Sequence, residues 1–164
     1  MSTEADVRSA IVTQLETDYA DFGFDNSPGN IKAYLPEGHE VEDLPAYFKA
    51  TVSSKKISRV IAVRVTFEEV LFTTNNQAER TYNILIQVYS KAANDGSGEQ
   101  FVIEGARKVL NSLRSINTDL SNTVDFTDDF FISEPTKVFF PELEEMMLVE
   151  LTSTAKAAGS LVTY

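Results

Sequence analysis

Apolar and polar residues alternate over one long segment near the middle of the chain. In ISRVIAVRVTF, residues 57–67, the apolar side chains occupy the odd positions, while Ser58, Arg64 and Thr66 occupy even ones. A period of two residues predicts a β-strand with one buried face. The residues expected to point inward are Ile57, Ile61, Val63, Val65 and Phe67.

A second alternating segment, TYNILIQVY at residues 81–89, follows shortly afterwards. The linking residues 73–80, TTNNQAER, contain Asn75-Asn76, which is turn chemistry. We therefore predict a long β-hairpin. On its second strand one face carries Tyr82, Ile84, Ile86 and Val88, and the other carries Asn83 and Gln87.

Two segments have a helical period instead. The first runs from about Glu4 to Tyr19 with an apolar residue every four positions, and Thr3 and Asp6 are placed to cap it. The second runs from about Glu99 to Ser115, after a capping box formed by Ser97 and Gln100. Its inward stripe is Val102, Ala106, Val109, Leu110 and Leu113.

The remaining structured segments are expected to be extended. IKAYL, residues 31–35, predicts a short strand, and YFKATVS, residues 47–53, is expected to pair with the strand from Ile57 after a bend at residues 54–56. Strands are also expected at VDFTDDFFIS, KVFF and LEEMMLVELTST. The last is apolar on both faces at residues 146–151, which favours a central strand or one that also meets a partner.

These elements predict a single α+β domain over residues 1–164. Its sheet is expected to be mainly antiparallel, with four to six strands, and to be flanked by two helices in a single layer. A chain of this length buries roughly 70% of its unfolded surface, which is enough for a real core.

The charge of the chain is strongly negative and unevenly distributed. The net charge is −11: residues 1–50 carry −7, residues 51–124 carry +2 and residues 125–150 carry −7. Such acidity disfavours a groove that grips nucleic acid, because phosphate binding depends on clustered Lys and Arg. Two interpretations remain open: a solvated surface, or regions of one subunit matched electrostatically to different regions of its neighbour, as in a head-to-tail ring.

Composition narrows the class further. Cysteine is absent, so there is no disulfide framework, thiol nucleophile or thiolate metal site. The start, MSTEADVRSA, is polar and acidic and predicts no signal peptide, and no apolar run approaches the ~20 residues that cross a bilayer. We expect a soluble protein.

Aromatic and acidic residues cluster between positions 126 and 144. Adjacent phenylalanines on a regular strand point to opposite faces, so one of Phe130-Phe131 is expected to point away from the local core. The cluster either packs under the helices of the same subunit or forms a contact between subunits. The interface candidates are Phe126, Phe130, Phe131, Phe139 and Phe140, and the acidic candidates for lining a channel are Asp128, Asp129, Glu142 and Glu144.

Catalytic and cofactor-binding patterns are weak. His39 is the single histidine and predicts a surface residue, not a metal ligand. Neighbouring acids such as Glu144-Glu145 point to opposite faces of a strand and form no acid–base pair. NDGSG, residues 94–98, lacks the spacing of a P-loop, and EVED and DFTDD lack EF-hand spacing. We predict no enzyme activity, cofactor or metal.

The order and texture of the elements resemble the tail terminator or tail-completion proteins of long-tailed bacteriophages. The resemblance rests on the helix ADVRSAIVTQLET, the segment PAYFKATV, the hairpin ending in RTYNILIQVYSKA, the helix EGARKVLNSLRS and the strand EMMLVELTST. It implies a homo-hexameric ring on the head-proximal end of the tail tube. Such a ring ends tube polymerisation and joins the tail to a head-completion or connector protein, after assembly in the host cytoplasm.

The resemblance also implies that DNA passes through without specific binding, and that neither a membrane nor a small-molecule substrate is involved. The alternative is another neck or tube subunit, such as a head-completion or tail tube protein. A small ligand-binding or enzymatic domain is the remaining class, because fold alone does not determine function.

Overall fold

The computed structural model of the chain describes its helices, its strands and some of their connections. The described backbone comprises residues 4–18, 31–33, 51–52, 55–56, 59–72, 77–91, 96–118, 124–126, 130–139, 145–157 and 162–163. Side chains are described for residues 7–18, 59–66, 81–91, 96–114, 130–139 and 145–155.

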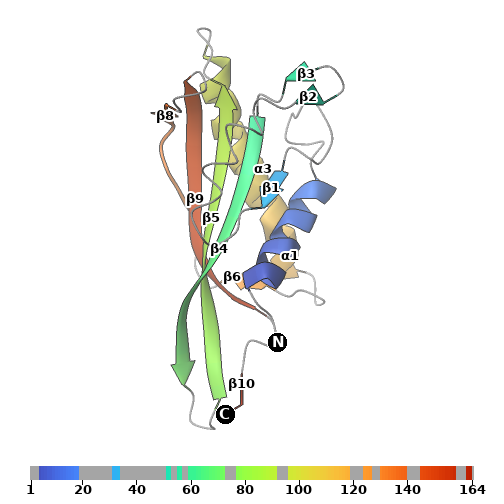
Figure 1. The fold of residues 1–164 in the computed structure, drawn as a ribbon, viewed down its shortest axis with the longest axis vertical. Coiled ribbons are helices and arrows are strands. Elements are labelled where there is room, and N and C mark those ends of the chain that lie inside the picture. Colours follow the sequence, from blue (N-terminus) through green and yellow to red (C-terminus); the bar gives the residue numbers. More distant parts are fainter. Residues whose placement is uncertain are drawn as a thin grey trace.

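One sheet holds most of the strands (Figure 1). Its order is β1 (Ile31–Ala33), β4 (Arg59–Phe72), β5 (Gln77–Lys91), β9 (Met146–Ala157) and β6 (Val124–Phe126). Short strands β7 (Phe131–Ile132) and β8 (Thr136–Val138) also pair with β9, and β10 (Val162–Thr163) pairs with β5. The sheet is antiparallel except for the parallel pair β1 and β4, so the predicted α+β class is confirmed.

The predicted hairpin is confirmed as strands β4 and β5. Val63 pairs with Ile86, and the predicted inward residues Ile61, Val63 and Val65 are fully buried. The register shifts between Phe67 and Glu69, so an extra residue bulges out of β4 and the alternation that holds before it breaks there. Both strands continue past this point, and the hairpin projects beyond the helix layer (Figure 1).

The predicted pairing of residues 47–53 with the strand from Ile57 is wrong. Strand β2 (Thr51–Val52) pairs with β3 (Lys55–Lys56) in a separate two-stranded sheet, so Lys55 and Lys56 lie in a strand and not in a bend. The outer side of β4 at Ile61–Val63 is already occupied by β1, which arrives from earlier in the chain.

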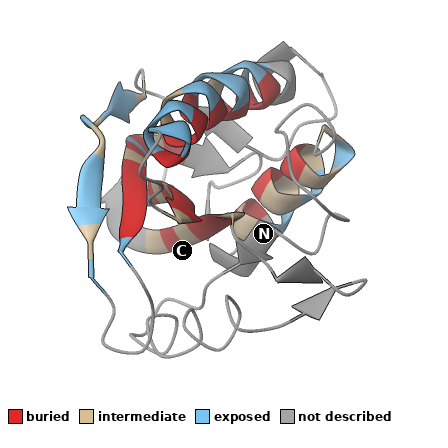
Figure 2. Cartoon of the chain, turned by 90° about the horizontal axis from the view of Figure 1, so that it is seen from above, coloured by how far each residue is buried: buried red, intermediate tan, exposed pale blue. Residues whose placement is uncertain are grey.

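Helices α1 (Glu4–Thr17) and α3 (Ser97–Thr118) lie on one face of the sheet (Figures 1 and 2). Helix α1 contacts β4 and β1, α3 contacts β5 and β9, and the two helices contact each other. Each turns its buried residues toward the sheet, as the helical periods predict. These residues are Val7, Ile11 and Leu15 from α1 and Phe101, Val102, Ala106, Val109 and Leu113 from α3.

Two glycines position α3. Gly96 has φ +77°, and its carbonyl accepts the first helical hydrogen bond from Gln100 at 3.1 Å, so the N-cap is Gly96 and not the predicted Ser97. At Gly105 an added Cβ would lie 3.1 Å from Cγ1 of Val88. The helix therefore approaches β5 so closely that even a Cβ at position 105 would crowd the Val88 side chain.

Candidate functional site

The aromatic segment forms one edge of the sheet. Along β9, Phe126 pairs with Ala155, Phe131 with Thr152 and Val138 with Met146, so β6, β7 and β8 follow one another along the same neighbour. β9 is thus an inner strand, as its apolar run at residues 146–151 predicts. The edge beside it consists of three short pieces.

The phenylalanines of this edge differ in their solvent exposure. Phe131 is 71% exposed and Phe139 is 70% exposed, whereas Phe130 is partly buried and packs against the main core. The neighbours Phe130 and Phe131 thus meet opposite environments, as alternation predicts. Phe126 lies in β6 without a described side chain, and Phe140 lies outside the described residues. The assignment of all five to an interface stays a prediction.

Hydrogen bonds hold the edge against β9 where its strands are interrupted. The Ser133 backbone N–H donates to the Glu150 carbonyl at 2.9 Å, and the Glu150 N–H donates to Oγ of Ser133 at 2.9 Å. Pro135 follows and has no N–H to donate to a ladder, which suits an edge position. The edge is therefore anchored on its inner side, while Phe131 and Phe139 and most of the residues between them are exposed or partly exposed (Figure 2).

The predicted acidic channel residues are not placed by the structure. Asp128, Asp129, Glu142 and Glu144 lie outside the described residues. Their neighbour Glu145 is described, and its carboxylate lies 3.8 Å from Nζ of Lys137. Both of these side chains are exposed, and such a pair contributes little to stability.

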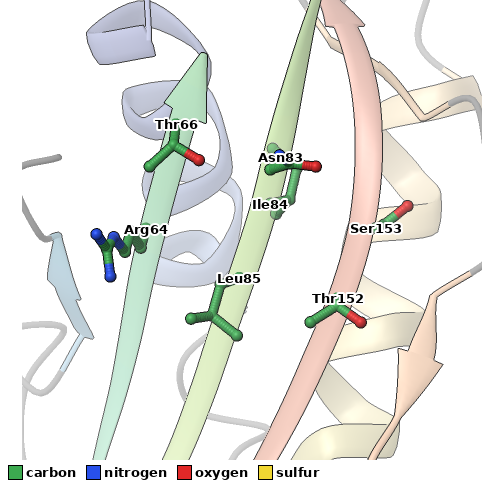
Figure 3. Close-up of a pocket in the computed structure, with 7 residues that line it drawn as sticks. All are labelled: Arg64, Thr66, Asn83, Ile84, Leu85, Thr152 and Ser153. Carbon is green, nitrogen blue, oxygen red and sulfur yellow. The ribbon is translucent and has the colours of Figure 1, made fainter. Parts of the chain in front are cut away.

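The sheet face opposite the helices carries a shallow hollow of about 280 Å³ (Figure 3). Its lining comes from the three central strands: Arg64 and Thr66 on β4, Asn83, Ile84 and Leu85 on β5, and Thr152 and Ser153 on β9. The lining contains one charged group and neither a carboxylate nor an imidazole. Sequence reasoning missed this hollow, although its signal is present: the polar residues at even positions of β4, and the apolar Leu85 between the polar Asn83 and Gln87.

A second hollow of about 270 Å³ lies where β4 meets α3. The Arg59 guanidinium stacks over the Phe101 ring, 4.1 Å from its centroid, and Lys108 also lines the space. The only lining carboxylate, Glu104, accepts a hydrogen bond from Nε2 of Gln100 at 3.1 Å. Neither hollow pairs two acids or an acid with an imidazole.

Beyond the hollow, the same sheet face becomes buried. Val60, Ala62, Tyr89, Met146 and Leu148 are each no more than 6% exposed, although they point away from the helices. Burial raises the pKa of the Tyr89 phenol, and the Glu150 carboxylate adds a smaller effect in the same direction.

Metal chemistry has no visible basis in the part of the chain that the structure describes. Within those residues no three His, Cys, Asp or Glu side chains gather in a metal-binding group. His39 and the segment EVED are not described, and of DFTDD only Asp125 and Phe126, in strand β6, are described.

No protein-family model matches the sequence, and no curated protein shows significant similarity to it. Among the helices of the described residues, none has the length and hydropathy needed to cross a membrane.

Proposed function

We propose that the protein is a virion structural subunit that caps the head-proximal end of a phage tail tube as a ring. The ring ends tube polymerisation and presents a surface for the head-completion or connector protein. The observation that carries this proposal is the sheet edge on which Phe131 and Phe139 are about 70% exposed. The two described hollows pair neither two acids nor an acid with an imidazole. The element order of the resemblance supports it as well.

Exposed aromatic side chains favour assembly as the role of this edge. Phe131 and Phe139 are exposed at separate points of this edge, and aromatic side chains that become buried on association dominate the energy of many interfaces. Phe131 lies in β7 and Phe139 directly follows β8, and both strands pair with β9, so little backbone freedom is lost on binding. When two different surfaces of identical subunits meet, the subunits form a closed ring if the rotations between successive neighbours add up to a full turn.

Mass in solution tests the assembly directly. A closed ring, alone or with tube protein, supports the proposal, and open polymers indicate a tube subunit instead. A protein that stays at 18.2 kDa under both conditions contradicts it.

Substitutions at the aromatic edge separate assembly from folding. Phe131→Asp and Phe139→Asp are each expected to reduce the ring to single subunits with an unchanged unfolding transition, because both side chains are largely exposed. Asn111→Asp, exposed on α3 and outside this edge, is the matched control for added charge. Phe130→Asp is expected to destabilise the fold itself, since Phe130 packs on the core. Rings that persist in both Phe131 and Phe139 variants contradict the role of this edge.

The acidic segment is proposed to line the channel and repel DNA phosphates. Replacing Asp128 and Asp129 together by lysine is expected to leave the ring intact but impair DNA passage or ejection, because lysine attracts phosphate. Infectivity of phage carrying this double variant, beside a glutamate double variant that keeps the charge, is the measurement. Normal infectivity with lysine contradicts a channel position.

A further inference from the structure

We draw no further inference here: the strongest candidate, the hollow on the sheet face opposite the helices, which Arg64, Asn83 and Thr152 line and which lies beside the exposed Phe131 that pairs with Thr152, is a sheet face for which nothing in the structure shows what covers it.

Discussion

Successive residues of strand β5 point to opposite faces of the sheet, and the two faces differ in their surroundings. Ile84 and Ile86 are at most 2% exposed beneath the helices, whereas Asn83 is exposed and Leu85 is only partly buried on the other face. The helix-covered face carries most of the apolar core, and the far face is polar over the hollow. Stability is therefore concentrated on one face, which leaves the exposed part of the other face and the edges available for contacts.

The largest effect is expected from two adjacent residues of β5 that point to opposite faces of the sheet. Ile86→Ala is expected to lower the free energy of unfolding by about 2–5 kcal/mol, because a fully buried side chain is lost beneath the helices. Leu85→Ala is expected to cost less than about 1 kcal/mol, because Leu85 lines the open hollow. Urea unfolding of both variants measures the difference, and equal losses would remove the distinction between the faces.

Features of the fold are predictable from the sequence when they depend on residues close together in the chain, and not when they depend on distant ones. The periods of two and 3.6 residues predict the hairpin, both helices and the buried stripe, because each is set by neighbours within a few positions. The parallel pairing of Ile31–Ala33 with β4 joins residues about thirty positions apart through three pairs, and it leaves no local signal. The bulge after Phe67 also leaves no local signal, because the residues on either side are ones that regular strands commonly contain.

The residue types of the candidate site were predictable from the sequence, but which of these residues are exposed and which of them lie together were not. The cluster of phenylalanines is plain in the sequence, but the pairing with β9 determines which of them are exposed, as Phe131 and Phe130 illustrate. The hollow draws Arg64, Asn83 and Thr152 from three strands distant in sequence. Their common face is defined only once the strand register is known.

A second prediction concerns the closest approach between helix and sheet. Gly105→Leu is expected to lower the free energy of unfolding by about 1–3 kcal/mol, because even a Cβ at this position lies 3.1 Å from Cγ1 of Val88. Adding Val88→Ala opens space at that point and is expected to recover part of the loss. A double-mutant cycle by thermal or urea unfolding measures this coupling, and strict additivity would argue against the contact.

A smaller effect is expected where the two helices meet. Ser112, buried on α3, donates a hydrogen bond from Oγ to Oδ2 of Asp18 at 2.6 Å, and Nε2 of Gln14 donates to the same oxygen at 3.0 Å. Ser112→Ala is expected to cost about 1–2 kcal/mol, because the carboxylate loses its shorter hydrogen bond. Ser9→Ala, exposed on α1, is the control and is expected to change stability by less than about 0.5 kcal/mol.

The smallest effect at neutral pH is expected at Tyr89, which belongs to the buried end of the far face. Burial raises its pKa in the folded protein, with a smaller contribution from Glu150, whereas the unfolded phenol titrates near pH ~10. Above that pH the unfolded state holds fewer protons, so this group makes stability fall by up to about 1.4 kcal/mol per pH unit until the folded pKa is passed.

Tyr89→Phe is therefore expected to flatten the loss of stability between pH ~10 and ~11 relative to the original protein. Urea midpoints measured at about pH 9, 10 and 11 give this slope. Glu150→Gln removes only the smaller cause, so most of the slope is expected to remain in that variant. An unchanged slope in Tyr89→Phe would mean that the phenol is accessible to water, and the far face would then be open along its whole length instead of closed at this end.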